Sequence, residues 1–161
     1  MSGSWKQWEF PNLKESDHKK TSEASDDYNC IAWAAFDDTK RWDPDEMEQH
    51  YWPPGIPRVI NLEVFKEVFR RLNFEDCDDA TFENGIEKIA IYATSDGQPT
   101  HIARQVDNGI WTSKLGYWED IEHYNLECLG GEKRDYFGRI MLYGKPVSYM
   151  KRIRVIPQKA E

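Results

Sequence analysis

Residues 87–105 read EKIAIYATSDGQPTHIARQ, and this stretch decides the fold that the sequence predicts. Lys88–Ala93 and Thr100–Val106 are rich in residues that favour strands. The loop between them contains Asp96-Gly97, a pair that is typical of hairpin turns. We therefore expect two adjacent antiparallel strands in this part of the chain.

Further strands are expected on the C-terminal side of this hairpin. Asn108-Gly109 repeats the turn signal and leads into a third strand at Ile110–Ser113. Arg139–Tyr143 and a segment near Met150–Val155 are also expected to be strands. Together these segments predict the antiparallel sheet of an α+β domain.

Helices are expected before the sheet. Cys30–Phe36 is apolar on every face, its alanines favour a buried helix, and Asn29 is one of three capping candidates. Asn61–Leu72 has apolar residues at helical spacing and begins with a second capping candidate. Asp45–Tyr51 is expected to add a short helical turn.

The composition indicates one globular domain. Of the 161 residues, 39% are hydrophobic and 14% are aromatic, which is enough apolar surface for a core. We expect an N-terminal arm and polar loop at residues 1–27, followed by a single domain at residues 28–157. The net charge of -8 argues against broad nucleic-acid binding, because phosphate contacts need Lys and Arg.

The cysteines and histidines limit the redox environment and the cofactors that we expect. The three cysteines, at positions 30, 77 and 128, are odd in number and form no CxxC pair, which favours a reducing, cytoplasmic location. No apolar run is long enough to span a membrane, and the four histidines lack metal-ligand spacings. We expect no metal and no other cofactor. The oligomeric state, and export as an effector, stay open.

Cys30 and His101 form the best candidate for a catalytic pair. Cys30 begins the predicted helix, where backbone N–H groups and the helix dipole stabilise a thiolate or an oxyanion. His101 follows on a predicted strand, and this order of helix and strand occurs in papain-like folds. Acidic neighbours disfavour a thiolate at Cys77 and Cys128. However, a cysteine in an alanine-rich helix is more often a small core residue.

A third side chain is needed to orient the imidazole of His101. The following strand offers Thr112 or Ser113, while Asp120 and His123 lie further along the chain. Asp120 is the preferred partner, because a carboxylate holds the tautomer and stabilises the imidazolium. A role as a cap or as a surface residue is the alternative for each of them.

Four blocks of sequence carry a resemblance to a known family. They are YNCIAWAAFDDTKRW (residues 28–42), YWPPGIPR (51–58), EKIAIYATSDGQPTHIARQ (87–105) and WTSKLGYWEDIEH (111–123). These blocks resemble an uncharacterised family of bacterial proteins, which in turn distantly resembles papain-like cysteine peptidases in the order of its cysteine and histidine. The resemblance implies a papain-like α+β fold, with N-terminal helices packed on an antiparallel sheet. It brings no assigned activity.

The resemblance also singles out residues for substrate binding. Arg104 or Gln105 would bind a substrate carboxylate or amide, and Lys114 would favour a thiolate. A structural salt bridge is an equally good explanation for such charges. The complete expected substrate-binding set is Asn29, Trp52, Arg104, Gln105, Ser113 and Lys114.

These patterns predict a cysteine-dependent hydrolase or acyl transferase that acts on an amide bond, as a peptidase, amidase or deamidase. Cys30 would attack the carbonyl, His101 would transfer the proton, and Asp120 would orient the imidazole. The expected partner is a peptide or protein amide substrate, with no nucleic acid and no membrane. The alternative is a non-catalytic module on the same fold that binds a ligand or protein, such as a toxin or immunity component.

Overall fold

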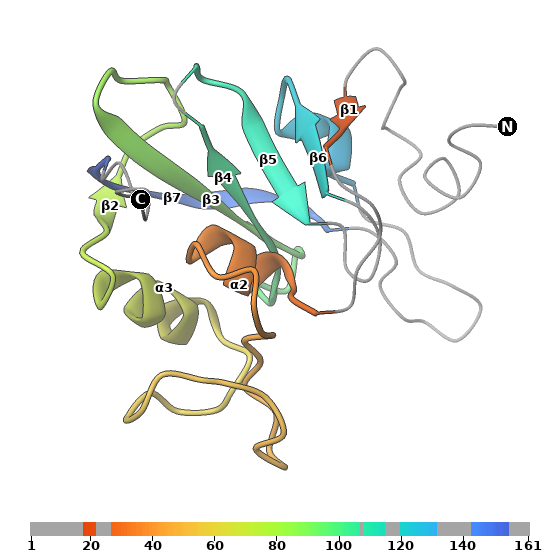
Figure 1. Ribbon diagram of the computed structural model, residues 1–161, viewed down its shortest axis with the longest axis vertical. Coiled ribbons are helices and arrows are strands. Elements are labelled where there is room, and N and C mark those ends of the chain that lie inside the picture. Colours follow the sequence, from red (N-terminus) through yellow and green to blue (C-terminus); the bar gives the residue numbers. More distant parts are fainter. Residues whose placement is uncertain (1–17, 22–26, 107, 115–119, 132–142, 155–161) are drawn as a thin grey trace, which may run out of the picture.

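An antiparallel sheet of seven strands forms the body of the protein (Figure 1). The computed structural model describes residues 18–21, 27–106, 108–114, 120–131 and 143–154. The strands lie in the order β1-β6-β5-β4-β3-β7-β2 across the sheet, and each pairing is antiparallel. They are β1 (His18–Lys20), β2 (Glu75–Cys77), β3 (Ile86–Ala93), β4 (Pro99–Gln105), β5 (Trp111–Lys114), β6 (Asp120–His123) and β7 (Lys145–Ile153).

The predicted hairpin at the centre of the sheet is confirmed. Strands β3 and β4 pair with Ile89 opposite Arg104 and Tyr92 opposite His101. The turn between them is closed by a hydrogen bond from the Thr94 amide to the Gln98 carbonyl at 3.0 Å. On its other edge β3 pairs along its whole length with β7. The segment expected near Met150–Val155 is thus part of a longer strand. Of the strand expected at Arg139–Tyr143, residues 139–142 lie outside the described part of the chain.

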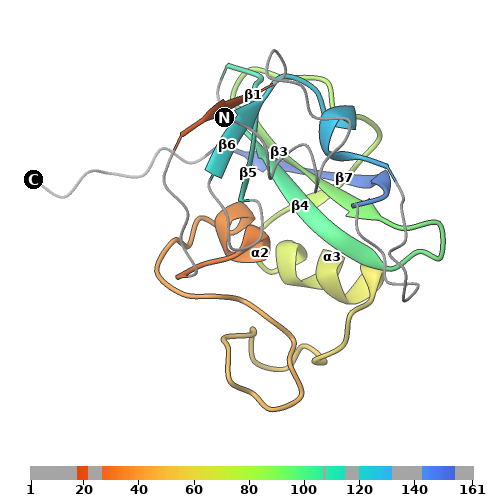
Figure 2. The same cartoon turned by 90° about the vertical axis from the view of Figure 1, so that its right-hand side faces the viewer.

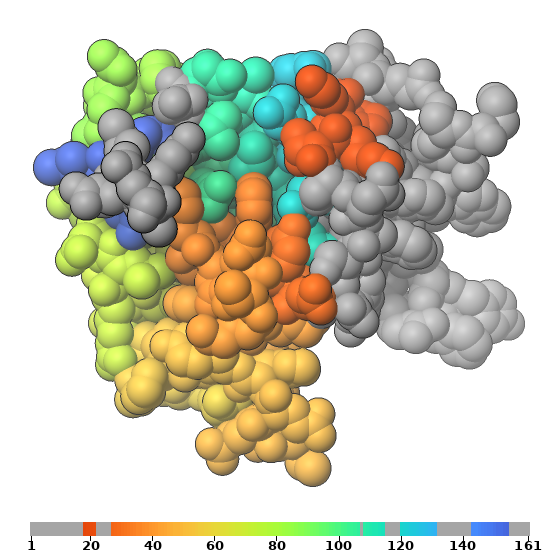
Figure 3. Space-filling model, viewed as in Figure 1, coloured from red at the N-terminus to blue at the C-terminus, as the bar shows by residue number. Residues whose placement is uncertain are grey.

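Two short helices lie on one face of the sheet, α2 (Cys30–Ala34) and α3 (Leu62–Arg70) (Figure 2). The buried residues of α3 are Phe65, Val68 and Phe69, at the three- and four-residue spacing that places them on one side of a helix. They pack with Ile89, Ile91, Ile102 and Met150 of the sheet and with Trp42 and Trp52 of the segment between the helices. In the space-filling view, this orange and yellow segment occupies the lower part of the molecule (Figure 3).

The opposite face of the sheet has a smaller core. Alternate residues of the same strands, among them Ala90, Tyr92 and Ala103, face this side and pack against the 3-10 helix η2 (Glu127–Leu129). The Tyr92 hydroxyl donates a hydrogen bond to the Leu126 carbonyl at 2.6 Å, which ties the covering segment to β3. The sheet is therefore buried on both faces at its centre.

The papain-like α+β fold expected from the sequence is wrong. Most of the regular secondary structure in the described residues is strand, with two short α-helices in place of a helical layer. The helix expected at Cys30–Phe36 ends at Ala34, since Phe36 has a φ of 65° and leaves the helical conformation. Asp45–Tyr51 forms no helix, because Tyr51 instead makes an isolated bridge with Trp42.

Polar segments that looked like loops extend the sheet at both edges. His18–Lys20, within the expected polar loop, pairs with β6, and Glu75–Cys77 pairs with β7. Neither segment has the alternation of apolar and polar residues that predicts a strand. Their backbone hydrogen bonds to a neighbouring strand decide the conformation, and a single sequence pattern does not reveal such a neighbour.

Gly144 is a point of close backbone approach beside β3. Its φ is 81°, and a Cβ atom there would lie 2.0 Å from the Ala93 carbonyl oxygen. Its amide donates to the Gly131 carbonyl at 2.7 Å, and the Gly131 amide donates back at 2.6 Å. Only glycine fits this geometry, and the preceding residue, Tyr143, is thereby held against the start of β4.

We expect Gly144→Ala to destabilise the protein far more than Gly97→Ala. Gly97 also has a positive φ, of 83°, but no atom of the described residues lies within 4 Å of its Cβ position. Alanine at Gly97 costs about 1–2 kcal/mol of backbone strain, and the clash at Gly144 adds a further ~1–3 kcal/mol. Urea unfolding of the two variants measures the difference, and equal losses would contradict the close approach.

Candidate functional site

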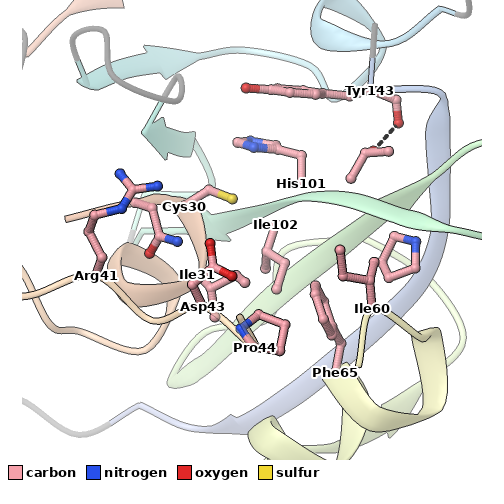
Figure 4. A pocket seen from close by; sticks show the side chains of 13 residues that line it. Cys30, Ile31, Arg41, Asp43, Pro44, Ile60, Phe65, His101, Ile102 and Tyr143 are labelled. Atoms are coloured by element: carbon pink, nitrogen blue, oxygen red, sulfur yellow. Dashed lines mark hydrogen bonds between the residues drawn. The ribbon is translucent and has the colours of Figure 1, made fainter. Parts of the chain in front are cut away.

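A cavity of about 250 Å³ contains both Cys30 and His101. It lies between the start of α2, the segment that precedes α3, and the first residues of β4. In Figure 4 the Cys30 sulfur and the His101 imidazole are on the same side of the cavity and point toward one another. The two residues that the sequence paired are therefore brought together by the fold.

Asn29 holds Cys30 at the beginning of its helix. Its side-chain oxygen caps α2 by accepting from the Ala32 amide at 3.1 Å, and it also accepts from the Trp42 amide at 3.2 Å. Its amide nitrogen donates to the Trp42 carbonyl at 2.7 Å. Asn29 lines the cavity, but both polar atoms of its side chain make hydrogen bonds with backbone groups. It fastens the segment that carries Arg41, another residue lining the cavity, to the start of α2.

Burial keeps the Cys30 thiol protonated at neutral pH. Loss of hydration raises its pKa above the ordinary value for a cysteine, and the backbone N–H groups of Ile102 and Ile31 and the charge of Arg41 only partly offset this. The helix that follows has five residues, so few aligned peptide dipoles are available to stabilise a thiolate. The resting form of Cys30 is a neutral thiol, which would need a base in order to act as a nucleophile.

His101 belongs to a chain of hydrogen bonds on the face of the sheet opposite α2. Its Nε2 lies 2.9 Å from the Ser113 hydroxyl, which in turn lies 2.7 Å from Nε2 of His123. Nδ1 of His123 lies 2.8 Å from the Asn125 carbonyl oxygen. Three adjacent strands, β4, β5 and β6, contribute the three side chains.

This chain of hydrogen bonds determines the tautomer of His101. A carbonyl oxygen only accepts, so Nδ1 of His123 carries a hydrogen and Nε2 of neutral His123 is an acceptor. The Ser113 hydroxyl therefore donates to His123 and accepts from Nε2–H of His101. Nδ1 of His101 is left with a lone pair, and this buried atom has no hydrogen-bond partner among the described residues. It is the atom that is free to act as a base.

Both imidazoles of the chain are neutral at pH 7. Burial, and then the proximity of His123, lower the pKa of His101 well below its ordinary value. Burial lowers the pKa of His123 to about 4, against the opposing effect of its hydrogen bond to Asn125. The neutral form is the one that the tautomer argument requires.

Aromatic rings hold the His101 imidazole in place. The Tyr143 ring stacks on it with centroids 4.1 Å apart and an angle of 6° between the planes. The Tyr92 ring approaches with a centroid separation of 5.3 Å and an angle of 63°. With the Ser113 hydrogen bond, these contacts leave the imidazole little rotational freedom.

Asp120, the preferred orienting residue from the sequence, lies elsewhere. Its carboxylate accepts a hydrogen bond from the Tyr28 hydroxyl. It pairs across the strands with Lys114, whose ammonium lies 5.3 Å from the centre of the Tyr28 ring. Successive residues of a strand point to opposite faces, so Ser113 and Lys114 face opposite sides of the sheet. Ser113 occupies the orienting position at His101.

The other expected substrate-binding residues make internal contacts. Arg104 donates to the Trp33 carbonyl at 2.8 Å and lies over the Trp33 and Phe36 rings, at 4.2 Å and 4.0 Å from their centroids. Burial lowers the pKa of this guanidinium to about 10. Trp52 is buried and donates to the Pro57 carbonyl, and Gln105 donates to the Ala80 carbonyl. These three are not among the described residues that line the cavity.

Several residues of the cavity were not found from the sequence. Arg41 and Asp43 are charged residues of its wall, Ile60 lies at its edge, and Tyr143 covers His101. Arg41 falls within the first of the four sequence blocks, which was a usable signal. No sequence signal marks Ile60 or Tyr143, because only the tertiary fold brings these two residues to the cavity.

The chain belongs to the family described as domain of unknown function DUF7689, whose model matches residues 19–151. Comparisons with curated proteins and with solved structures find no significant match. None of the helices among the described residues has the length and apolar character needed to cross a membrane. In the same part of the chain, no three His, Cys, Asp or Glu side chains gather as metal ligands would.

Imidazole nitrogen NMR tests the hydrogen-bond chain directly. We expect the N–H hydrogen on Nε2 in His101 and on Nδ1 in His123 at neutral pH, because the Asn125 carbonyl can only accept. Long-range nitrogen–proton spectra of a labelled sample distinguish the two tautomers. In Ser113→Ala the His101 signal should become a mixture of tautomers, and an unchanged signal would refute the role given to the hydroxyl.

The two buried histidines should also make stability fall in mild acid. Each has a folded-state pKa below the unfolded value of about 6.5, so the unfolded chain binds more protons as the pH falls. For His123, whose pKa falls to about 4, the loss between pH 6.5 and 4 is about 3 kcal/mol at ~1.4 kcal/mol per pH unit. Urea unfolding across this range should show a shallower pH dependence in His123→Gln, with His50→Gln, outside the hydrogen-bond chain, as control.

Proposed function

We propose that this protein is a cysteine-dependent hydrolase or acyl transferase acting on an amide bond, with Cys30 as nucleophile and His101 as base. One observation carries the proposal. Nδ1 of His101, which has no hydrogen-bond partner within the described part of the chain, and the Cys30 thiol line the same cavity, and the chain of hydrogen bonds behind the imidazole leaves Nδ1 as the basic atom. A nucleophile, a base and a group that orients the base are the parts that such chemistry needs.

The reaction follows from the resting protonation states. As the sulfur attacks the substrate carbonyl, the thiol proton passes to Nδ1 of His101 and a C–S bond forms. The imidazolium then gives this proton to the leaving nitrogen as the C–N bond breaks, which leaves a thioester on Cys30. Water, or a second amine, attacks the thioester with Nδ1 again as base, and the thiol is restored. Ser113 keeps its hydrogen bond to Nε2 throughout.

Burial predicts general-base catalysis rather than a resting ion pair. A preformed thiolate–imidazolium pair requires a low thiol pKa and a raised imidazole pKa, and burial shifts both groups the other way. The proton therefore moves during attack, as it does in a hydroxyl nucleophile activated by a histidine. The two mechanisms therefore predict different pH dependences of the acylation rate.

One observation favours the alternative, a non-catalytic module that binds a ligand in the same cavity. No hydrogen bond joins Nδ1 of His101 to the Cys30 thiol in the described residues, and the thiol is protonated. A catalytic hydrogen bond is often long in a protein without substrate and shortens in the complex. The acyl-transfer experiment separates the two functions.

Acylation by p-nitrophenyl acetate should be confined to Cys30 and should have a flat rate between about pH 7 and 8.5. An unassisted thiol below its pKa reacts about tenfold faster per pH unit because the thiolate is the nucleophile, whereas the neutral imidazole is already fully available. In His101→Gln we expect the rate at pH 7 to fall by roughly 10²–10⁴ and to regain the steep pH dependence. Ser113→Ala should lie between the two. Intact-protein mass spectrometry and release of nitrophenolate provide the measurements.

The matched control is Cys77→Ser, because Cys77 does not line the cavity and lies on the edge strand β2. This variant should keep the wild-type rate and pH profile, while Cys30→Ala should lose both. A folded wild-type protein that forms no acyl thioester at Cys30, or forms one at the same rate without His101, would favour the binding module.

A further inference from the structure

We infer that the end of the cavity formed by Pro44, Ile60 and Phe65 is a subsite for one uncharged, apolar group of the substrate, close to the carbon that Cys30 attacks. The inference rests on the proposed function and adds the class of substrate: an amide with an aliphatic or aromatic group beside the reacting carbon.

The walls of this end come from separate parts of the chain. Pro44 lies in the segment after α2, Ile60 just before α3, and Phe65 within α3. In Figure 4 these three side chains lie on the side of the cavity away from Arg41, and Ile102 lies between Cys30 and the side chains of Ile60 and Phe65. Three hydrocarbon surfaces therefore converge within reach of the nucleophile.

Ile60 is the residue that points to a ligand. Its surface is 55% exposed although it has no polar atom in its side chain, while Phe65 beside it is buried in the core. Single exposed apolar residues are common on protein surfaces, and neighbouring Val59, 48% exposed, is such a residue outside the cavity wall. Ile60 differs because its exposed surface continues the buried hydrocarbon wall. An apolar group in the cavity would remove that surface from water.

The charges of the cavity lie away from Ile60 and Phe65. In Figure 4 Arg41 is on the far side of Cys30 and the Asp43 carboxylate lies between Cys30 and Pro44, while Pro44, Ile60 and Phe65 themselves carry no charge. A carboxylate or ammonium group placed against Ile60 and Phe65 would lose hydration without gaining a partner. A neutral hydrocarbon group meets no such cost.

The size of the cavity limits the occupant to a single small group. Its volume of about 250 Å³ lies just below the ~300–1,000 Å³ of sites that enclose a drug-sized molecule. A branched aliphatic or benzyl group fills this space together with the reacting carbonyl. Selectivity from such a contact reaches roughly tenfold or more.

Three N-substituted chloroacetamides and the unsubstituted reagent test the subsite through alkylation of Cys30. N-benzyl, N-carboxymethyl and N-(2-aminoethyl) chloroacetamide are compared with unsubstituted chloroacetamide. In each reaction a C–S bond forms, chloride leaves, and the thiol proton is taken by His101. Each rate is divided by the rate with N-acetylcysteine, which removes differences in intrinsic reactivity. We expect the N-benzyl reagent to label Cys30 about tenfold faster than unsubstituted chloroacetamide, with no gain for either charged reagent.

Two substitutions at neighbouring exposed positions provide the matched comparison. Ile60→Asn should remove most of the benzyl preference, measured as the ratio of the N-benzyl rate to the rate with unsubstituted chloroacetamide in the same variant. Val59→Asn introduces the same side chain outside the cavity wall and should change neither rate. Equal rates for the four reagents, a preference for the N-carboxymethyl reagent, or an equal effect of the two substitutions would each overturn the inference.

The outcomes also separate this inference from the proposed function. A benzyl preference that persists in His101→Gln, in a protein without the flat pH profile of acylation, would support the subsite and refute the catalytic role. A flat pH profile that depends on His101, without any benzyl preference, would support the catalytic role and refute the subsite.

Discussion

The carbonyl oxygen of Asn125 can only accept a hydrogen bond, and the chemistry of the site depends on that constraint. It requires a hydrogen on Nδ1 of His123, which makes Ser113 a donor to His123 and an acceptor from His101. The Asn125 carbonyl, which His123 and Ser113 connect to His101, therefore leaves Nδ1 of His101 as the basic atom. No carboxylate is needed to hold this tautomer, because a chain of neutral groups with one fixed end serves the same purpose.

The sheet makes this chain possible. His101, Ser113 and His123 come from β4, β5 and β6, which are neighbours in the sheet, and all three side chains lie on the face away from α2. Cys30 reaches the cavity from the other direction, at the start of α2. The close approach at Gly144 places Tyr143 over the imidazole. The site thus lies at the N-terminal end of the central strand β4, where groups from the two faces of the sheet can meet.

Burial sets the protonation of the site. It raises the pKa of the Cys30 thiol and lowers the pKa of both histidines, so the thiol and both imidazoles are neutral in the resting protein. A low-dielectric cavity penalises a standing pair of opposite charges unless further hydrogen bonds stabilise each of them. In the proposed reaction, charge separation is therefore confined to the moment of attack. The apolar end of the cavity continues the same low-polarity environment.

The sequence alone was sufficient for the parts that depend on local pattern. The central hairpin follows from strand-forming residues around Asp96-Gly97, and the helix at Leu62–Arg70 follows from its apolar spacing and its Asn61 cap. Cys30 and His101, which the sequence paired from their places at a helix start and on a strand, line the same cavity. The order of these elements suggested a papain-like fold, which the structure excludes because the expected helices are short or missing and polar edge segments join the sheet.

Only the tertiary structure decided which side chain supports His101. Asp120 was the better partner by chemistry, yet it lies beside Tyr28, while Ser113 and His123 lie behind the imidazole. The choice depends on which face of the sheet each residue occupies and on the strand that lies next to it. Strand register sets both, and a shift of one residue exchanges the two faces. Register arises from pairing between distant segments, so the residue types at positions 113, 120 and 123 do not determine it.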